Sequence, residues 1–303
     1  MTMKSRFIII AILFLVACKD DKQKAPTQID SKNIETIKLS SKKPDLNISI
    51  LLDLSDRINP KKYPNPTMEY FERDLGYINS IAKSFELHIR SKRTNKINDH
   101  IHLYIDPEPS DSNLNEKIEL LDMTFTKNNA KREYIMQTSV LYDSISRLIY
   151  KSAINDNNYI GSDLWSFFKT NVEDFCIEKN HRNILVILTD GYLYHKDSKL
   201  REKNQTSYLR PQDIKNFKLN TSNWKTTIET KNYGFISTKD SLQDLEVLIL
   251  GINPNPKNPY EQDVILQYWK NWLNSMKIKN FQIKTAILPA NMDKIIKDYI
   301  LKK

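Results

Sequence analysis

The sequence predicts an α/β fold: a three-layer, mostly parallel, doubly wound sheet with helices on both faces and an insertion between two C-terminal strands. Short apolar runs rich in Ile and Val, each stopped by turn residues, alternate with longer stretches whose apolar residues recur every three or four positions. The first pattern is typical of strands covered on both faces, and the second is typical of amphipathic helices. Their alternation favours right-handed crossovers, which bring the carboxyl ends of the strands to one edge of the sheet.

Five segments have the strand pattern and five have the helical pattern. The predicted strands are residues 46–52, 100–105, 184–188, 245–250 and 281–287. The predicted helices are residues 68–85, 134–148, 164–175, 265–276 and 291–302. Residues 192–243 fit neither pattern and are long for a connection, so we expect an insertion beside the carboxyl edge of the sheet, with a small hairpin.

The N-terminus predicts a signal peptide rather than a membrane-spanning helix. Lys4 and Arg6 precede eleven apolar residues at 7–17, whereas a spanning helix needs about 20. Residues 15–18 (LVAC) resemble the lipobox of bacterial lipoproteins. The resemblance implies cleavage before Cys18, lipidation of that cysteine with diacylglycerol and palmitate, and anchoring in the lipid bilayer.

The residues after Cys18 bear on localisation and on domain organisation. Residues 19–21 (KDD) resemble the signal that sends lipoproteins of some Gram-negative lineages to the outer face of the outer membrane, although a generic polar tether has the same composition. We therefore expect an exported outer-membrane lipoprotein, facing either the cell surface or the periplasm. The predicted organisation is a signal peptide at 1–17, a flexible tether at 18–44, and a domain at 45–303 that contains the insertion at 192–243.

The charge distribution argues against a nucleic-acid-binding protein, and the cysteine content argues against a fold held by internal disulfides. The formal net charge is +9, but apart from a small cluster at residues 90–96 the basic excess is spread along the chain. A nucleic-acid surface needs more concentrated positive charge with interleaved aromatic residues, so we expect no nucleic-acid partner. The one other cysteine, Cys176, has no partner for an internal disulfide, so a hydrophobic core must hold the fold.

Residues with side-chain oxygens follow two of the predicted buried strands. Asp53 and Ser55 follow the first strand, and Asp190 follows the third. Ser162 and Asp163 lie in a Gly-Ser-Asp loop that opens a helix. Each of them alone also fits a turn or a helix N-cap. Together they predict a polar site at the carboxyl edge, where open α/β sheets bind ligands.

The order of these three loops resembles a von Willebrand factor A (vWA) domain over residues 46–300. The resemblance implies a metal-ion-dependent adhesion site that holds Mg²⁺ through Asp53, Ser55, Ser162 and Asp190. Mg²⁺ prefers about six oxygen ligands and keeps several waters, so an acidic residue of a protein ligand has room to complete the shell. These residues form no evident pair of nucleophile and base, so we expect a binding protein rather than an enzyme.

Position 57 departs from the Asp-x-Ser-x-Ser pattern of that family. Arginine has no acceptor atom and stays charged, so it cannot ligate a metal. Three outcomes are open. Arg57 points outward and leaves the site one ligand short; it reaches inward and pairs with Asp53 or Asp190 in place of the metal; or Asp56 or Asp163 supplies a different oxygen.

Two alternative functions are compatible with the same residues. In a metal-dependent hydrolase, such as a phosphoesterase, Asp53 would be a nucleophile or ligand and Arg57 would stabilise a phosphoryl group. The Asp-x-Asp pattern of phosphatases of the haloacid dehalogenase type is absent, because position 55 is Ser. A structural envelope component would keep the fold with a vestigial ion site. The five histidines show no metal-ligand spacing, and we expect His100 and His102 to be edge residues.

Overall fold

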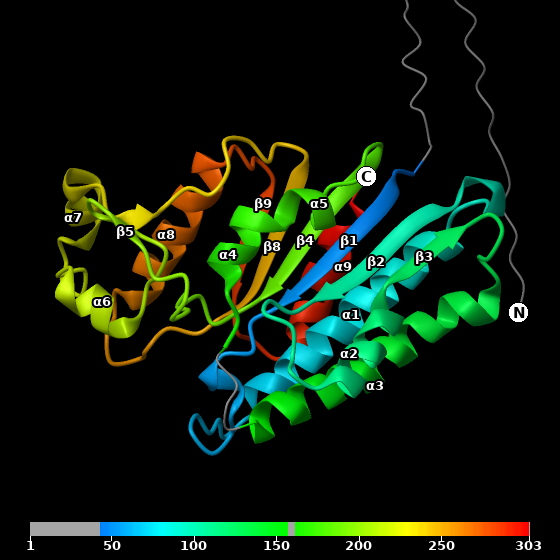
Figure 1. Cartoon of the computed structure of the whole chain (residues 1–303), viewed down its shortest axis with the longest axis horizontal. Coiled ribbons are helices and arrows are strands. Elements are labelled where there is room, and N and C mark those ends of the chain that lie inside the picture. Colours follow the sequence, from blue (N-terminus) through cyan, green and yellow to red (C-terminus); the bar gives the residue numbers. More distant parts are fainter. Residues whose placement is uncertain (1–42, 157–160, 303) are drawn as a thin grey trace, which may run out of the picture. The chain divides into compact units, whose positions relative to one another are not determined.

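A computed structural model describes residues 43–156 and 161–302, which are built around a six-stranded sheet (Figure 1). The strand order is β3-β2-β1-β4-β8-β9, in which β3 is antiparallel to β2 and the other pairings are parallel. The strands are β1 (Asp45–Leu52), β2 (Asn98–Tyr104), β3 (Met123–Thr126), β4 (His181–Leu188), β8 (Leu245–Ile252) and β9 (Phe281–Thr285). This mostly parallel, vWA/Rossmann-like sheet confirms the predicted fold class.

Helices cover both faces of this sheet (Figure 1). One face carries α1 (Tyr70–Arg90), α2 (Ser112–Ile118), α3 (Arg132–Asn155) and α9 (Pro289–Leu301). The other carries α4 (Leu164–Thr170), α5 (Val172–Cys176) and α8 (Glu261–Ser275). Successive side chains of a strand point to opposite faces. In β4, Ile184 and Val186 therefore pack against the first set of helices, and Leu185 and Ile187 against the second, which explains why this apolar run is continuous.

Several elements differ from the sequence prediction, among them the helix α2, which was not predicted. The four-residue strand β3 was not predicted, because it is a short antiparallel edge strand. The single helix predicted at 164–175 is divided at Asn171 into α4 and α5. The amide of Asn171 donates a hydrogen bond to Asp106 Oδ2 at 3.2 Å, so this polar residue is tied to the loop after β2 instead of continuing a helical stripe.

Residues 192–243 lie between β4 and β8 and form a small layer of their own. They contain a three-stranded sheet and two short helices: β5 (Arg201–Glu202), β6 (Gln205–Thr206), α6 (Pro211–Asn216), α7 (Trp224–Lys231) and β7 (Gly234–Phe235). Strands β5 and β6 form an antiparallel hairpin. Phe235 packs edge-on against Trp269 and Trp272 of α8, at ring-centroid distances of 6.0 and 5.4 Å. The insertion is thereby anchored on the helix that covers β8.

The strand order creates a switch point between β1 and β4. The chain leaves β1 toward β2 on one side, whereas it leaves β4 toward β8 on the other. Ligands of open α/β sheets bind at such a point, outside the carboxyl ends of the strands. The backbone N–H of Asp53 donates to the carbonyl oxygen of Leu188 at 2.9 Å, which keeps the two strand ends together.

Among the described residues, no helix combines the length and the apolar character that crossing a bilayer requires. The predicted signal peptide and the tether up to residue 42, including Cys18, lie outside the described residues.

Candidate functional site: a buried arginine among three carboxylates

Asp53 is fixed at the carboxyl end of β1 by hydrogen bonds to both of its carboxylate oxygens. Oδ1 accepts from the backbone N–H of Ser55 at 3.1 Å, and Oδ2 accepts from the hydroxyl of Thr189 at 2.6 Å. Burial raises the pKa of Asp53 above its ordinary value, while attraction to Arg57 and the bond from Thr189 act in the opposite direction. The side chain is 2% exposed, so it is a poor candidate for direct contact with a ligand.

Arg57 lies in the interior of the site, although its side chain is the longest in the loop. It is 4% exposed, and its Nη2 donates to Asp74 Oδ2 of α1 at 2.7 Å. The same oxygen accepts from the hydroxyl of Tyr150 of α3 at 3.0 Å. Burial alone would lower the pKa of Arg57, but attraction to Asp74, Asp190, Tyr150 and Asp53 outweighs it and raises the pKa. The guanidinium is therefore a fixed positive charge at the switch point.

This position decides between the outcomes left open for Arg57. The outward orientation is wrong, because the side chain is buried. The side chain lies inward, but its hydrogen-bonded partner is Asp74 rather than Asp53 or Asp190, and its replacement of a metal stays a prediction. The one-turn 3₁₀-helix η1 (Asp56–Ile58) carries Arg57 back toward α1 and makes this pairing possible.

A glycine on the neighbouring strand leaves room for the guanidinium. Gly251 of β8 has a φ of +102°, and an added Cβ would lie 3.0 Å from the carbonyl oxygen of Thr189 and 3.8 Å from Arg57 Nη2. A side chain at position 251 would therefore strain the backbone and crowd the end of β4.

Asp190, at the end of β4, is the third carboxylate of the cluster. Its Oδ1 accepts from the backbone N–H of Tyr192 at 3.0 Å. Burial, followed by repulsion from Asp53, raises the pKa of Asp190 to about 7 against the attraction of Arg57. The single guanidinium of Arg57 thus offsets only part of the negative charge of the three carboxylates.

The two serines are engaged differently. The hydroxyl of Ser162 accepts from the backbone N–H of Leu54 and donates to the carbonyl oxygen of Leu52, both at 2.9 Å. Ser162 thereby ties the loop before α4 to the end of β1. The buried hydroxyl of Ser55 has no aligned hydrogen-bond partner among the described residues. The structure thus brings Asp53, Ser55, Ser162 and Asp190 to the adjoining ends of β1 and β4, and their role as metal ligands stays a prediction.

The donor set fits a resident Mg²⁺ poorly. Mg²⁺ requires near-octahedral oxygen ligands at about 2.0–2.1 Å. Both oxygens of Asp53 and the hydroxyl of Ser162 are already hydrogen-bonded within the protein. The buried guanidinium of Arg57 would repel a divalent ion, and in a low-dielectric site that repulsion is strong. These residues fit an acidic cluster neutralised by arginine better than a metal shell.

Asp163 and Asp56 were the alternative oxygen donors. Asp163 caps α4, since its Oδ1 accepts from the backbone N–H of Ser166 at 3.0 Å. Its Oδ2 lies 3.2 Å from Nδ1 of His195, a buried residue of the insertion. Asp163 therefore joins the insertion to the carboxyl edge. The side chain of Asp56 lies outside the described part of the structure, so a ligand role for it stays a prediction.

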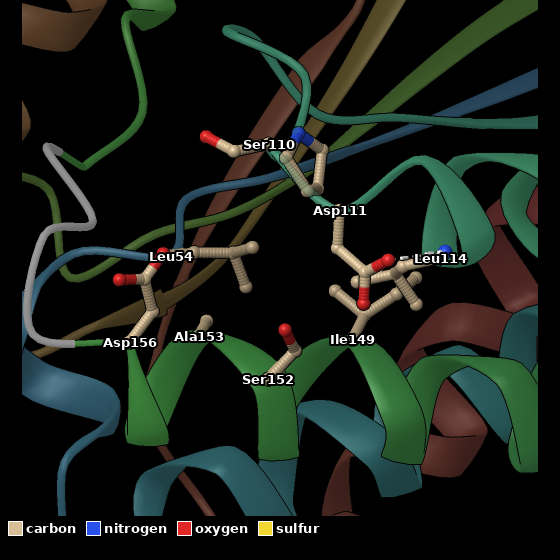
Figure 2. Close-up of a pocket in the computed structure, with 9 residues that line it drawn as sticks. Leu54, Ser110, Asp111, Leu114, Ile149, Ser152, Ala153 and Asp156 are labelled. Atoms are coloured by element: carbon tan, nitrogen blue, oxygen red, sulfur yellow. Dashed lines mark hydrogen bonds between the residues drawn. The ribbon is translucent and has the colours of Figure 1, made fainter.

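The cavities among the described residues are too small or too open to define a substrate site. Figure 2 shows a cavity of about 30 Å³ beside Leu54, between the start of α2 and the Ile149–Ser152 turn of α3. That volume holds about one or two waters, whereas ligand pockets usually measure about 300–1,000 Å³. A hollow of about 540 Å³ between Glu173 and residues 237–241 opens to solvent and is lined by polar loop residues.

The sequence analysis did not identify Asp74 and Tyr150 as members of the site. Both come from helices, far along the chain from the strand-end loops. A signal for Asp74 was nevertheless present, because it lies within the apolar stripe of its helix, three residues after Phe71 and four before Ile78. A charged residue on the buried face of a helix requires a partner.

Comparisons with known proteins show distant structural similarity alone. No family model matches the chain, and the search of curated proteins gives no match. A crystal structure of an aerotolerance-related membrane protein from Bacteroides fragilis, with multiple mutations to serine, is 10% identical with a TM-score of 0.37, covering 85% of this chain and 100% of that one. The pilus adhesin SpaC from Lactobacillus rhamnosus GG is 11% identical with a TM-score of 0.38, covering 85% of this chain.

This chain spans 31% of the adhesin's length. Similarities at these TM-scores assign neither a family nor a function, and the fold class rests on the sheet topology itself.

Proposed function

We propose that this chain is an exported lipoprotein, anchored in the outer membrane through acylated Cys18, whose vWA-like domain binds an acidic protein partner and catalyses no reaction. The anchor is supported by the short apolar N-terminus and by the lipobox-like residues 15–18. The binding surface is the insertion at 192–243, where it adjoins the carboxyl edge of the sheet.

The observation that carries the proposal is a cluster of aromatic and cationic side chains on the insertion, in which Tyr194 is exposed and Tyr208 is buried. Arg210 is also paired with Asp213 at 2.8 Å, and 37% of its side chain remains exposed. The guanidinium of Arg210 lies 4.4 Å from the ring centroid of Tyr194 and 5.6 Å from that of Tyr208. Tyr194 is 42% exposed. Tyrosine and arginine dominate the residues that contribute most to protein–protein affinity, because they combine a large contact area with polar groups.

Charge indicates the chemistry of the partner. Residues 192–243 contain ten basic and five acidic residues, a much larger positive excess than their share of the chain. A basic surface attracts acidic partners and speeds their association. An acidic side chain of the partner would meet these cations directly, without a bridging Mg²⁺.

The hydrolase alternative is less favourable on chemical grounds. Arg57 is buried and paired with Asp74, so its guanidinium is not available to a phosphoryl group. Asp53 is 2% exposed and both of its oxygens accept hydrogen bonds within the protein, so its carboxylate is poorly placed to attack a substrate. We therefore propose a binding role and not an enzymatic one.

The test compares capture of outer-membrane proteins by the immobilised full chain and by variants. Tyr194→Ala combined with Arg210→Ala should lower capture of the specific partner by at least about tenfold. The matched control is Lys294→Ala, an exposed lysine of α9 on the opposite face. It should leave capture unchanged.

Two further conditions separate the proposal from Mg²⁺ bridging. A chelator should not affect capture, whereas raised salt should weaken it because the contact is electrostatic. Loss of capture with chelator, regained with Mg²⁺, would contradict the direct contact. Equal capture by the double variant would contradict the location on the insertion.

A further inference from the structure

His100, Glu178 and His181 form a cluster at the amino-terminal end of the sheet, opposite the edge that holds Asp53. Nδ1 of His100 lies 2.6 Å from Glu178 Oε2, and Nδ1 of His181 lies 3.7 Å from Glu178 Oε1. One ligand atom from each residue lies within 4.8 Å of those of the other two. The imidazole ring centroids are 5.1 Å apart.

The fold explains why residues so far apart in sequence meet here. β1 pairs in parallel with both β2 and β4, so His100 of β2 and the first residue of β4 lie on either side of it. α5 ends at Cys176, and Glu178 follows in the short loop that leads into β4. His100 is not an edge residue as expected, because β3 pairs with β2 on its outer side.

The other ring nitrogen of His181 has a partner of the kind that metal-ligating histidines use. Nε2 lies 3.1 Å from the carbonyl oxygen of Asn98. Histidines that bind metals usually donate their second N–H to a carboxylate or a backbone carbonyl, which fixes the tautomer and directs the free lone pair at the metal. A hydrogen on Nε2 leaves the lone pair of Nδ1 for an ion beside Glu178, and ion binding would replace the contact of Nδ1 with the carbonyl oxygen of Lys179 at 3.0 Å.

We propose that His100, Glu178 and His181 bind one Zn²⁺ ion, with the fourth position open to water. Two imidazoles and one carboxylate form an established type of zinc site with three protein ligands. The site is separate from the proposed partner surface and does not depend on it.

The geometry requires small side-chain movements. Ligand atoms in a tetrahedral zinc site are about 3.3 Å apart, as zinc–ligand bonds of about 2.0–2.1 Å imply. The distances from the Glu178 carboxylate to Nδ1 of His100 and to Nδ1 of His181, 2.6 and 3.7 Å, lie on either side of that value. The side chain of Glu178 is 39% exposed and can turn toward the ion, and that exposure also admits water.

The neighbouring His102 provides a matched control. It lies on the same face of β2, with its ring centroid 5.9 Å from that of His100. Its Nδ1 lies 2.7 Å from Asp122 Oδ1, so it belongs to a separate pair. Replacing His102 removes an imidazole of similar exposure without touching the three ligands.

The test is Zn²⁺ binding by the full chain, purified without a histidine tag and stripped of metals. Competition against a chromogenic zinc chelator should give one ion per chain, and Co²⁺ should give the visible bands of a tetrahedral site. His100→Ala and Glu178→Gln should each weaken binding by at least about 10–100-fold. His102→Ala should bind as the unaltered protein does. Urea unfolding of the metal-free variants checks that each remains folded.

Two results would overturn the proposal. One is the absence of Zn²⁺ binding at micromolar concentrations, which would leave a plain His100–Glu178 ion pair. The other is equal affinity in the unaltered protein and in both ligand variants, which would assign the ion to another place.

Discussion

The two ends of the central sheet both gather ionisable side chains, but they balance charge in different ways. At the carboxyl edge, Arg57 supplies a positive charge from within the chain and is 4% exposed. At the amino-terminal end, His100 and His181 surround Glu178, whose side chain is 39% exposed. In the first cluster Arg57, Asp53 and Asp74 are buried and the arginine offsets part of the negative charge, whereas the second cluster is more open and is the one for which we propose a bound cation.

The difference teaches that similar residue types acquire different roles through burial. A buried charge must be paired, because its desolvation costs several kcal/mol, whereas a partly exposed one keeps much of its hydration. The carboxyl-edge cluster should therefore control the stability of the fold. The histidine cluster should have little influence on stability and more on ligand binding.

The largest expected effect follows from removing the internal cation. Arg57→Leu leaves Asp74, Asp53 and Asp190 without their counter-charge and should lower the free energy of unfolding by about 3–5 kcal/mol. Urea denaturation measures it. Arg147→Ala is the control, because that arginine is 51% exposed and its ion pairs should contribute less than about 1 kcal/mol.

A loss below about 1 kcal/mol for Arg57→Leu would show that the cluster does not need its arginine. If the variant does not fold, adding Asp74→Asn should restore part of the stability, because it removes the carboxylate to which Arg57 binds directly.

The second largest effect on stability is expected at Thr189, whose hydroxyl links the end of β4 to Asp53 at the end of β1. Thr189→Val keeps the shape of the side chain but leaves Asp53 Oδ2 and the N–H of Gly191 without their partner. We expect a loss of about 2 kcal/mol, because unsatisfied buried groups cost about 1–3 kcal/mol. Thr170→Val, at an exposed position of α4, should change stability by less than about 0.5 kcal/mol. Equal effects of the two substitutions would contradict the structural role of Thr189.

The third effect is a dependence of stability on pH. The pKa of Asp190 rises from 3.8 to about 7 on folding, so the folded protein binds more protons than the unfolded chain between these values. Stability from this group is therefore present below pH 4 and falls as the pH rises toward and through 7. Asp190→Asn removes the group whose ionisation burial disfavours, so it should raise the free energy of unfolding by more at pH 8 than at pH 5.

Unfolding curves at the two pH values test this sign. A variant that is less stable than the unaltered protein at pH 8 would show that the Asp190 carboxylate is stabilised by Arg57 rather than strained by burial.

The smallest effect is expected at the histidine cluster. His100→Gln should change the stability of the metal-free protein by less than about 1 kcal/mol, because the ion pair with Glu178 is partly exposed. With Zn²⁺ present, the unaltered protein should become more stable and the variant should not, since binding to the folded state alone stabilises it. A large loss of stability in the metal-free variant would show that the histidine cluster depends on a buried ion pair, as the carboxyl-edge cluster does.

Much of the sheet could be predicted because buried parallel strands have continuous apolar runs. β1, β4 and β8 are such runs, and the residues that end them mark the carboxyl edge. The convergence of Asp53 and Asp190 follows from the topology alone, since β1 and β4 are neighbours at the switch point. The antiparallel strand β3 has four residues, too few to show a period.

The partners within each cluster could not be predicted in the same way. The pairing of Arg57 with Asp74 depends on which face of α1 meets the sheet, and on the space that Gly251 leaves beside Thr189. The histidine cluster joins β2 to the start of β4 through the register of β1. That register is a property of the assembled sheet and has no counterpart in sequence spacing.

Arg57 is part of the polypeptide, so the positive charge that it supplies at the carboxyl edge cannot dissociate into the medium. A metal ion can be diluted, exchanged or removed by a competing chelator, whereas a guanidinium on the chain is present in every folded molecule. Adhesion that depended on this edge would be constitutive, with the same strength in calcium- or magnesium-poor surroundings as in rich ones.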